Sequence, residues 1–157
     1  AFLDPSRRDE QARKVFRLGE CVPDVTALQK KIFSFCDVVM VKTSPLLDIQ
    51  QGLRELEYVS QVYVVSVENE CKELLFLMQK QFSEECTIEA IDLKNNGSVN
   101  SALHFRVSEE RKSIISYSEP RIFIYEPNGA ILKAGAFKNV AIKYGLEKIS
   151  DNTHLYT

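Results

Sequence analysis

The sequence predicts a mixed α/β fold in which parallel strands are followed by an antiparallel hairpin, and three patterns carry this prediction. Short, nearly continuous apolar runs at 38–41 and 62–67 are typical of strands buried on both faces, as in a parallel sheet. A segment with apolar residues at helical spacing precedes each run, which indicates crossover connections. A polar break at 68–71 then leads to another apolar run, and this favours a hairpin because a parallel connection needs a longer crossover.

The first half of the chain is predicted to contain two helices. Pro23 and Asp24 mark the start of the first, since apolar residues then recur at helical spacing. Ser44 and Pro45 predict the start of the second, with the Ser44 hydroxyl as its cap and proline at the first helical position. The second helix is expected to bury four residues at the same spacing: Leu46, Ile49, Leu53 and Leu56.

The second half of the chain shows more varied patterns. Strands are predicted over three ranges: 87–93, 103–107 and 122–125. Alternation in the second of these places His104 on the solvent side. The charged segment 108–113 is expected to be an exposed loop or turn, and a helix is predicted from Gly129 to about Tyr144, ended by Gly145.

Composition excludes several classes of function. The net charge of −2 means that any contact with nucleic acid must come from a local basic patch. No apolar run approaches the length of a membrane span, and no signal peptide is recognisable. The four cysteines form no CxxC pair and the two histidines lie far apart in sequence, so no metal site is expected. Size and pattern favour reduced thiols in a cytoplasmic protein.

The chain lacks a recognisable cofactor cradle. Its six glycines do not have the spacing of a G-x-G-x-x-G or Walker-type phosphate loop, and no G-x-S-x-G is present. The chain also starts on what reads as the tail of a strand, at Phe2 and Leu3. We therefore expect a piece of a longer protein, and the alternative is a trimmed chain with little missing. A cut sheet would expose an apolar edge through which the chain could pair with itself.

Two loops are candidate functional sites. Asp4 and Pro5 follow the first strand and would form a rigid corner that accepts hydrogen bonds, while Arg7 and Arg8 could clamp phosphate. The second loop, residues 42–44 (Lys-Thr-Ser), follows the strand at 38–42, and ligands in open α/β sheets bind beyond the carboxyl ends of strands. The alternatives are a surface turn with salt bridges and a strand that simply ends in a capped helix.

Several short motifs follow one another in a fixed order. They are Asp4-Pro5-Ser6-Arg7-Arg8-Asp9, Val15-Phe16, Cys21-Val22-Pro23, Lys42-Thr43-Ser44-Pro45-Leu46-Leu47-Asp48-Ile49, Glu68-Asn69-Glu70-Cys71-Lys72-Glu73-Leu74-Leu75, Tyr125-Glu126-Pro127-Asn128, Lys133-Ala134-Gly135 and Asn152-Thr153-His154-Leu155-Tyr156-Thr157. Together they resemble a bacterial family of class I S-adenosylmethionine-dependent methyltransferases with a C-terminal THUMP-like region. The resemblance covers nearly the whole chain.

The resemblance implies that residues 1–118 are the C-terminal half of a Rossmann-like methyltransferase core. It implies that residues 119–157 begin a ferredoxin-like or THUMP-like α+β accessory domain. The S-adenosylmethionine loop would then lie outside this chain, and THUMP-type regions imply an RNA substrate. Asp4 and Pro5 look like part of the Asp/Asn-Pro-Pro-aromatic corner that holds the target nitrogen in the wider superfamily. Ser6 and Arg7 replace its second proline and its aromatic ring, which argues against base stacking there.

Two hypotheses about function follow. In the first, the chain is a fragment, inactive alone, of an RNA methyltransferase that acts by positioning and desolvation. Asp4 and Pro5 would then orient the acceptor, while Lys42, Ser44 and Lys72 contact phosphate or line the cleft. In the second, the chain is a non-catalytic module that binds RNA or protein. A third reading is an α/β domain in which every motif serves packing.

Overall fold

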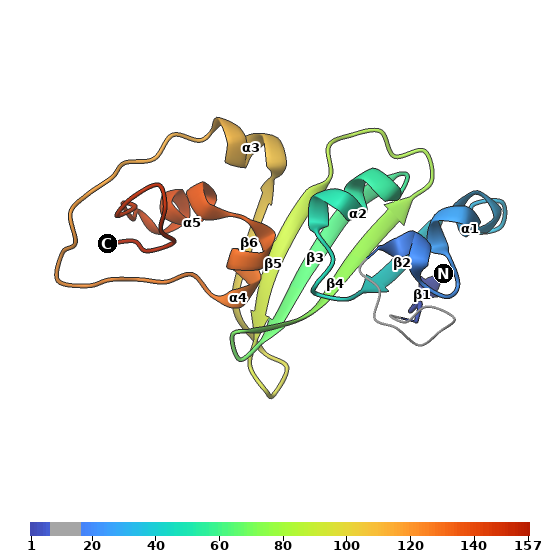
Figure 1. The fold of residues 1–157 in the computed structure, drawn as a ribbon, viewed down its shortest axis with the longest axis horizontal. Coiled ribbons are helices and arrows are strands. Elements are labelled where there is room, and N and C mark those ends of the chain that lie inside the picture. Colours follow the sequence, from blue (N-terminus) through green and yellow to red (C-terminus); the bar gives the residue numbers. More distant parts are fainter. Residues whose placement is uncertain (7–16) are drawn as a thin grey trace. The chain divides into compact units, whose positions relative to one another are not determined.

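The computed structural model describes residues 1–6 and 17–157 (Figure 1). The strands are β1 (Phe2–Leu3), β2 (Val38–Thr43), β3 (Val59–Val67), β4 (Glu70–Gln79), β5 (Thr87–Leu93) and β6 (Val99–Arg106). The α-helices are α1 (Val25–Ile32), α2 (Ile49–Glu55), α3 (Val107–Lys112), α4 (Gly129–Ala134) and α5 (Phe137–Tyr144), and a 3-10 turn covers Leu18–Glu20.

The described strands form one mixed sheet in the order β1-β2-β4-β3-β5-β6. β1 pairs with β2 in parallel, whereas β4 runs antiparallel to β2 and β6 antiparallel to β5. β3 and β4 are neighbours joined by a two-residue turn, which confirms the predicted hairpin and the mixed α/β class. β4, the second strand of this hairpin, lies between β2 and β3 in the sheet.

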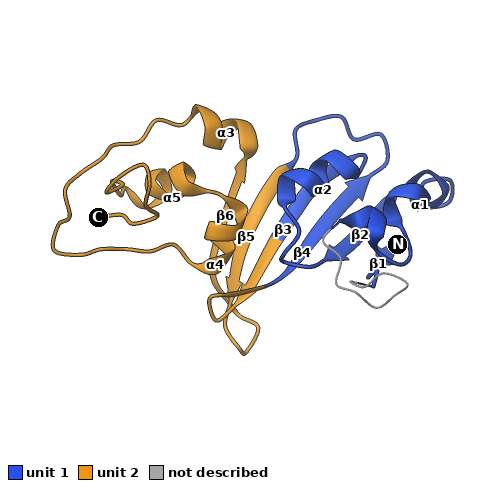
Figure 2. Ribbon diagram, viewed as in Figure 1, with its two compact units in different colours: residues 1–63, 72–86 blue, residues 64–71, 87–157 orange. Residues whose placement is uncertain are grey.

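The chain divides into two compact units, coloured separately in Figure 2. Unit 1 comprises residues 1–63 and 72–86, and unit 2 comprises residues 64–71 and 87–157. β3 and β4 therefore each contribute residues to both units.

In unit 1, one face of the strands carries the core. Val39 and Val41 of β2 are fully buried, whereas Val38 is 49% exposed and Met40 is half-buried. The prediction that this run is buried on both faces is therefore wrong for the described residues. β4 shows the same alternation, in which Phe76 is 0% exposed. Continuous apolarity identified the strand, but it did not reveal that only one face is covered.

The helix after β2 begins later than predicted. Ser44 and Pro45 lie in a turn, and the Ser44 Oγ accepts a hydrogen bond from the Leu46 amide at 3.2 Å. The cap of α2 is Asp48, whose carboxylate accepts from the Gln51 amide at 2.7 Å. Leu46, expected to be buried, is 65% exposed, while Leu47 is buried instead. The helix begins after Asp48 because the turn that precedes it buries Leu47.

We expect Asp48→Ala to lower the free energy of unfolding by about 1 kcal/mol, because the first turn of α2 loses its side-chain acceptor. Ser44→Ala is the matched control and is expected to change stability by less than roughly half of that amount, since Ser44 caps no helix. Urea unfolding of both variants measures the difference. An equal loss in the two variants would contradict the assignment of the cap.

Unit 2 departs from the prediction in two helical segments. Residues 108–113, expected to be a loop, contain most of α3, whose Glu109 carboxylate accepts from the Arg106 amide at 2.7 Å. The helix predicted over 129–144 is two helices, because Gly135 adopts a left-handed conformation with φ 73° and ends α4. Gly145 ends α5 in the same conformation, as predicted.

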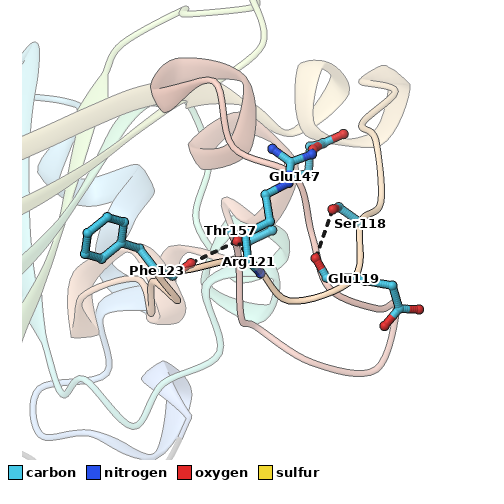
Figure 3. Close-up of polar contacts among 6 residues, drawn as sticks. All are labelled: Ser118, Glu119, Arg121, Phe123, Glu147 and Thr157. Atoms are coloured by element: carbon cyan, nitrogen blue, oxygen red, sulfur yellow. Dashed lines mark hydrogen bonds and ion pairs between the residues drawn. The ribbon is translucent and has the colours of Figure 1, made fainter.

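The predicted strand at 122–125 is absent as a regular element. Tyr125 forms a single antiparallel bridge with Tyr156, and Ile122 is 91% exposed. Side-chain contacts anchor this segment instead, as Figure 3 shows: the Thr157 hydroxyl donates to the Phe123 carbonyl at 2.9 Å, and Arg121 forms an ion pair with Glu147. An apolar run here reflects exposed side chains on an extended segment rather than a core strand.

Candidate functional site

The structure brings the two candidate loops together at one edge of the sheet. The parallel register pairs Leu3 with Val41, so Asp4 and Lys42 follow at neighbouring positions. The Lys42 Nζ lies 2.5 Å from the Asp4 Oδ2. The side chain of Lys42 is 27% exposed and that of Asp4 is 47% exposed, which leaves the pair accessible to a ligand. The adjacency predicted from the sequence is confirmed for these two residues.

Backbone contacts hold the corner that presents Asp4. Pro5 is buried, so the corner is fixed on its inner side. The Ser6 amide donates to the Val22 carbonyl at 2.8 Å. Arg7 and Arg8 lie outside the described residues. The Asp4 carboxylate is therefore carried on a rigid element, as a positioning group requires.

The loop after β2 is equally constrained. The Thr43 hydroxyl is buried and lies 3.5 Å from the Leu74 carbonyl that accepts its hydrogen bond. The Leu47 amide donates to the Ser44 carbonyl at 3.1 Å, which closes the turn. Ser44 is half-buried and lies in this turn, two residues beyond Lys42. Its hydroxyl already accepts one hydrogen bond, so it can offer its hydrogen to a ligand.

Lys72 lies on the opposite face of the sheet from Lys42. Lys42 pairs with Leu75 across the antiparallel ladder, and cross-strand partners share a face. Lys72 is three residues from Leu75 along β4, and side chains alternate along a strand. The structure therefore does not place Lys72 beside the Asp4–Lys42 pair.

Glu73, which the sequence did not single out, lies on the Lys42 face. It is two residues from Leu75 along β4, toward the carboxyl end of β2. Only the register of β4 against β2 identifies this residue. No single-sequence pattern predicts that register.

A second cluster of polar groups, in unit 2, has a structural role. The Asp92 carboxylate is buried and accepts from the Ser66 hydroxyl at 2.6 Å, the Asn69 amide at 3.0 Å and the Asn100 side chain at 2.9 Å. Burial raises the pKa of Asp92, but these three hydrogen bonds outweigh it and place that pKa below its ordinary value of 3.8. The donors hold the tip of the β3–β4 hairpin.

The hairpin tip also contacts the start of α4. The Asn69 Oδ1 accepts from the Gly129 amide at 2.6 Å, and a Cβ added at Gly129 would lie 2.4 Å from the Asn69 carbonyl oxygen. Asn128 caps α4 and donates to the Ser101 hydroxyl at 2.8 Å. The Glu-Asn-Glu-Cys and Glu-Pro-Asn-Gly motifs therefore pack against each other, which explains both without a ligand.

Unit 2 also contains a largely apolar pocket of about 450 Å³. Its lining includes Tyr125, Glu126, Tyr144 and Tyr156. The Tyr156 hydroxyl donates to the Phe137 carbonyl at 2.8 Å, and desolvation raises its pKa to about 12. Tyr156 is thus neutral at physiological pH and serves packing, whereas Tyr125 and Tyr144 are about half exposed.

Among the described residues there is neither a disulfide nor a cluster that could hold a metal ion. No group of three or more histidine, cysteine, aspartate or glutamate side chains among them could hold a metal ion. All four cysteines are free, and burial raises the pKa of Cys86 to about 12, so that thiol stays protonated. Within the described ranges, no helix is both long and apolar enough to span a bilayer.

Comparison with known proteins gives two matches. Residues 123–157 match the family model of a ferredoxin-like domain. The chain is also similar to a crystal structure from Porphyromonas gingivalis W83 of a protein named as a candidate methyltransferase, with 35% sequence identity and a TM-score of 0.85. That similarity covers 99% of this chain but 38% of the P. gingivalis chain, so our chain spans well under half of its length. No curated protein matches.

Proposed function

We propose that this chain is part of a class I S-adenosylmethionine-dependent methyltransferase that acts on RNA. The similarity to the P. gingivalis protein along almost the whole of this chain carries the proposal. The ion pair of Asp4 and Lys42 at the carboxyl edge of two parallel strands supports it, because ligands bind at this edge in open α/β sheets.

In this proposal the two loops bind and orient the acceptor. Asp4, fixed by the buried Pro5, accepts a hydrogen bond from the target group, and Lys42 and Ser44 line the same edge. Arg7 and Arg8 are proposed to contact phosphate, whereas Lys72 is left out of this site because it lies on the opposite face of the sheet. Holding the acceptor on rigid elements lowers the activation barrier of methyl transfer, because the orientation of the acceptor is already fixed.

The described residues do not fit S-adenosylmethionine. No glycine-rich turn follows a strand among them, and the three glycines at positive φ, Gly97, Gly135 and Gly145, end a hairpin turn and two helices. We therefore assign the cofactor site to a part of the protein outside this chain. The domain division at about residue 118 and the THUMP-like character of the region after it belong to the same proposal.

Residues 1–157 alone are expected to bind S-adenosylmethionine too weakly for calorimetric detection and to transfer no methyl group. Calorimetric titration of the isolated chain measures this. Tight binding would mean that the cofactor site has been assigned to the wrong part of the protein.

The proposal is tested with the complete gene product that carries these residues, radiolabelled S-adenosylmethionine and total RNA. Asp4→Ala is expected to lower transfer roughly 100-fold or more, because the acceptor loses its orienting carboxylate. Asp37→Ala is the matched control, since Asp37 forms a more exposed ion pair with Lys80 at 3.6 Å in the same unit.

Two outcomes would contradict the proposal. Full transfer by Asp4→Ala would mean that the corner serves packing alone. RNA binding by the complete gene product without transfer to any RNA would favour the non-catalytic binding module.

A further inference from the structure

We infer that the acceptor recognised by the Asp4–Lys42 pair is a hydroxyl group, the ribose 2′-hydroxyl of RNA, and not an amino group of a base. This inference rests on the proposed function and specifies its substrate class. It depends on which hydrogen-bonding groups the corner presents, and on how far apart they lie.

The pair presents a cationic donor beside an anionic acceptor. The Lys42 ammonium has three N–H donors and no acceptor, while the Asp4 carboxylate only accepts. Their separation of 2.5 Å means that any group bonded to one is also close to the other. The ion pair uses one donor and one oxygen, which leaves further donors and a second oxygen for a ligand.

A hydroxyl complements this arrangement. It donates one hydrogen and accepts through two lone pairs, so it can donate to Asp4 while its oxygen accepts from Lys42. The amino group of a base has a delocalised lone pair and acts as a donor only. Bound to Asp4, its nitrogen offers no acceptor to the Lys42 ammonium, so a donor of Lys42 gains no partner from the substrate.

Glu73 lies on the same face of the sheet as Lys42. Diagonal neighbours on one face of an antiparallel pair lie about 7–8 Å apart, within reach of long side chains such as those of lysine and glutamate. Lys42 and Glu73 therefore lie on one face of unit 1, where the Lys42 ammonium contacts the Asp4 carboxylate. The proposal includes Glu73 as a residue on this face that can approach the ammonium when Asp4 bonds the substrate.

The position of the methyl group tests the inference without any variant. RNA labelled by the complete gene product is hydrolysed with alkali, which cuts after a free 2′-hydroxyl and leaves a 2′-O-methylated link intact. We expect the label in alkali-resistant dinucleotides. Label in base-methylated mononucleotides would overturn the inference while leaving the methyltransferase proposal in place, and no label at all would overturn both.

Binding gives a second readout that is independent of transfer. RNA with a 2′-deoxy substitution at the mapped target is expected to bind roughly tenfold more weakly, because both charged groups lose their partner. In Lys42→Ala this preference is expected to shrink, because only Asp4 still bonds the hydroxyl, and in the control Lys80→Ala it remains at full size. A preference of equal size in Lys42→Ala would show that Lys42 does not contact the hydroxyl.

For Glu73, kinetics separate positioning from a structural role. Glu73→Gln is expected to lower kcat roughly tenfold with KM nearly unchanged and with an unaltered thermal midpoint. Glu70→Gln, on the opposite face of β4, is the control and keeps the wild-type kcat. Equal kcat values in the two variants would remove Glu73 from the site.

Discussion

Phe76→Ala is expected to lower the free energy of unfolding by about 3–5 kcal/mol, the range for removing a fully buried aromatic side chain. Phe76 is 0% exposed and lies on the face of β4 that α2 covers. The ring reaches so close to α2 that a Cβ added at Gly52 would lie 2.5 Å from its tip. Alanine would leave a cavity between the helix and the strand that rigid backbone cannot fill. Urea unfolding with an unchanged m-value measures the loss.

The contact between the Phe76 ring and α2 predicts that the effect of Gly52→Ala on stability changes sign when the ring is removed. In the wild type, Gly52→Ala is expected to destabilise by about 1–3 kcal/mol, because the Phe76 ring must move. In a Phe76→Leu background the ring is gone, so alanine is expected to be neutral or to stabilise the helix by up to about 1 kcal/mol. Equal effects of Gly52→Ala in both backgrounds would show that the ring does not limit the approach of α2.

The meeting of Asp4 and Lys42 could be predicted because it depends on topology alone. Carboxyl ends of parallel strands meet at one edge, whatever the details of packing. The two-residue strand β1 and the strand β2 were recognisable from apolar runs, and the residues after them followed. The position of Glu73 on the Lys42 face could not be predicted, since it depends on the register between β2 and β4, which the alternating pattern does not fix.

The predicted boundaries of helices were wrong where two local signals compete. Ser44 and Asp48 are both good caps, and the choice between them depends on the burial of Leu47. Gly135 lies inside a run with helical spacing, and a single glycine is tolerated in a helix. Its left-handed conformation ends α4 because Ala136 and Val140 pack as part of a second helix. Tertiary packing decides both cases.

The buried Asp92 is the second position where a large effect is expected. Asp92→Ala should lower the free energy of unfolding by roughly 3 kcal/mol, because it removes a charged acceptor and leaves buried donors without their partner. Ser66 is 0% exposed, and without Asp92 its hydroxyl would keep only the longer hydrogen bond to the Ile91 carbonyl at 3.4 Å. A double-mutant cycle with Ser66→Ala is expected to show a coupling of about 1–3 kcal/mol. Additive losses would contradict the direct interaction.

The pH dependence gives a second test with a definite sign. The folded pKa of Asp92 is lowered, so its contribution to stability is fully present above the ordinary value of 3.8 and is lost as pH falls through the folded pKa. The difference in unfolding free energy between the wild type and Asp92→Asn is therefore expected to be constant near neutral pH and to shrink as the pH falls below the ordinary pKa of 3.8 toward the lowered folded pKa. A difference that grows on acidification would mean that the carboxyl is protonated in the folded protein, so that desolvation prevails over its three hydrogen bonds.

The alternating pattern of β5, in which Ile88, Ala90 and Asp92 share the buried face, is the sequence signal for this residue, because a charge at a core position requires partners.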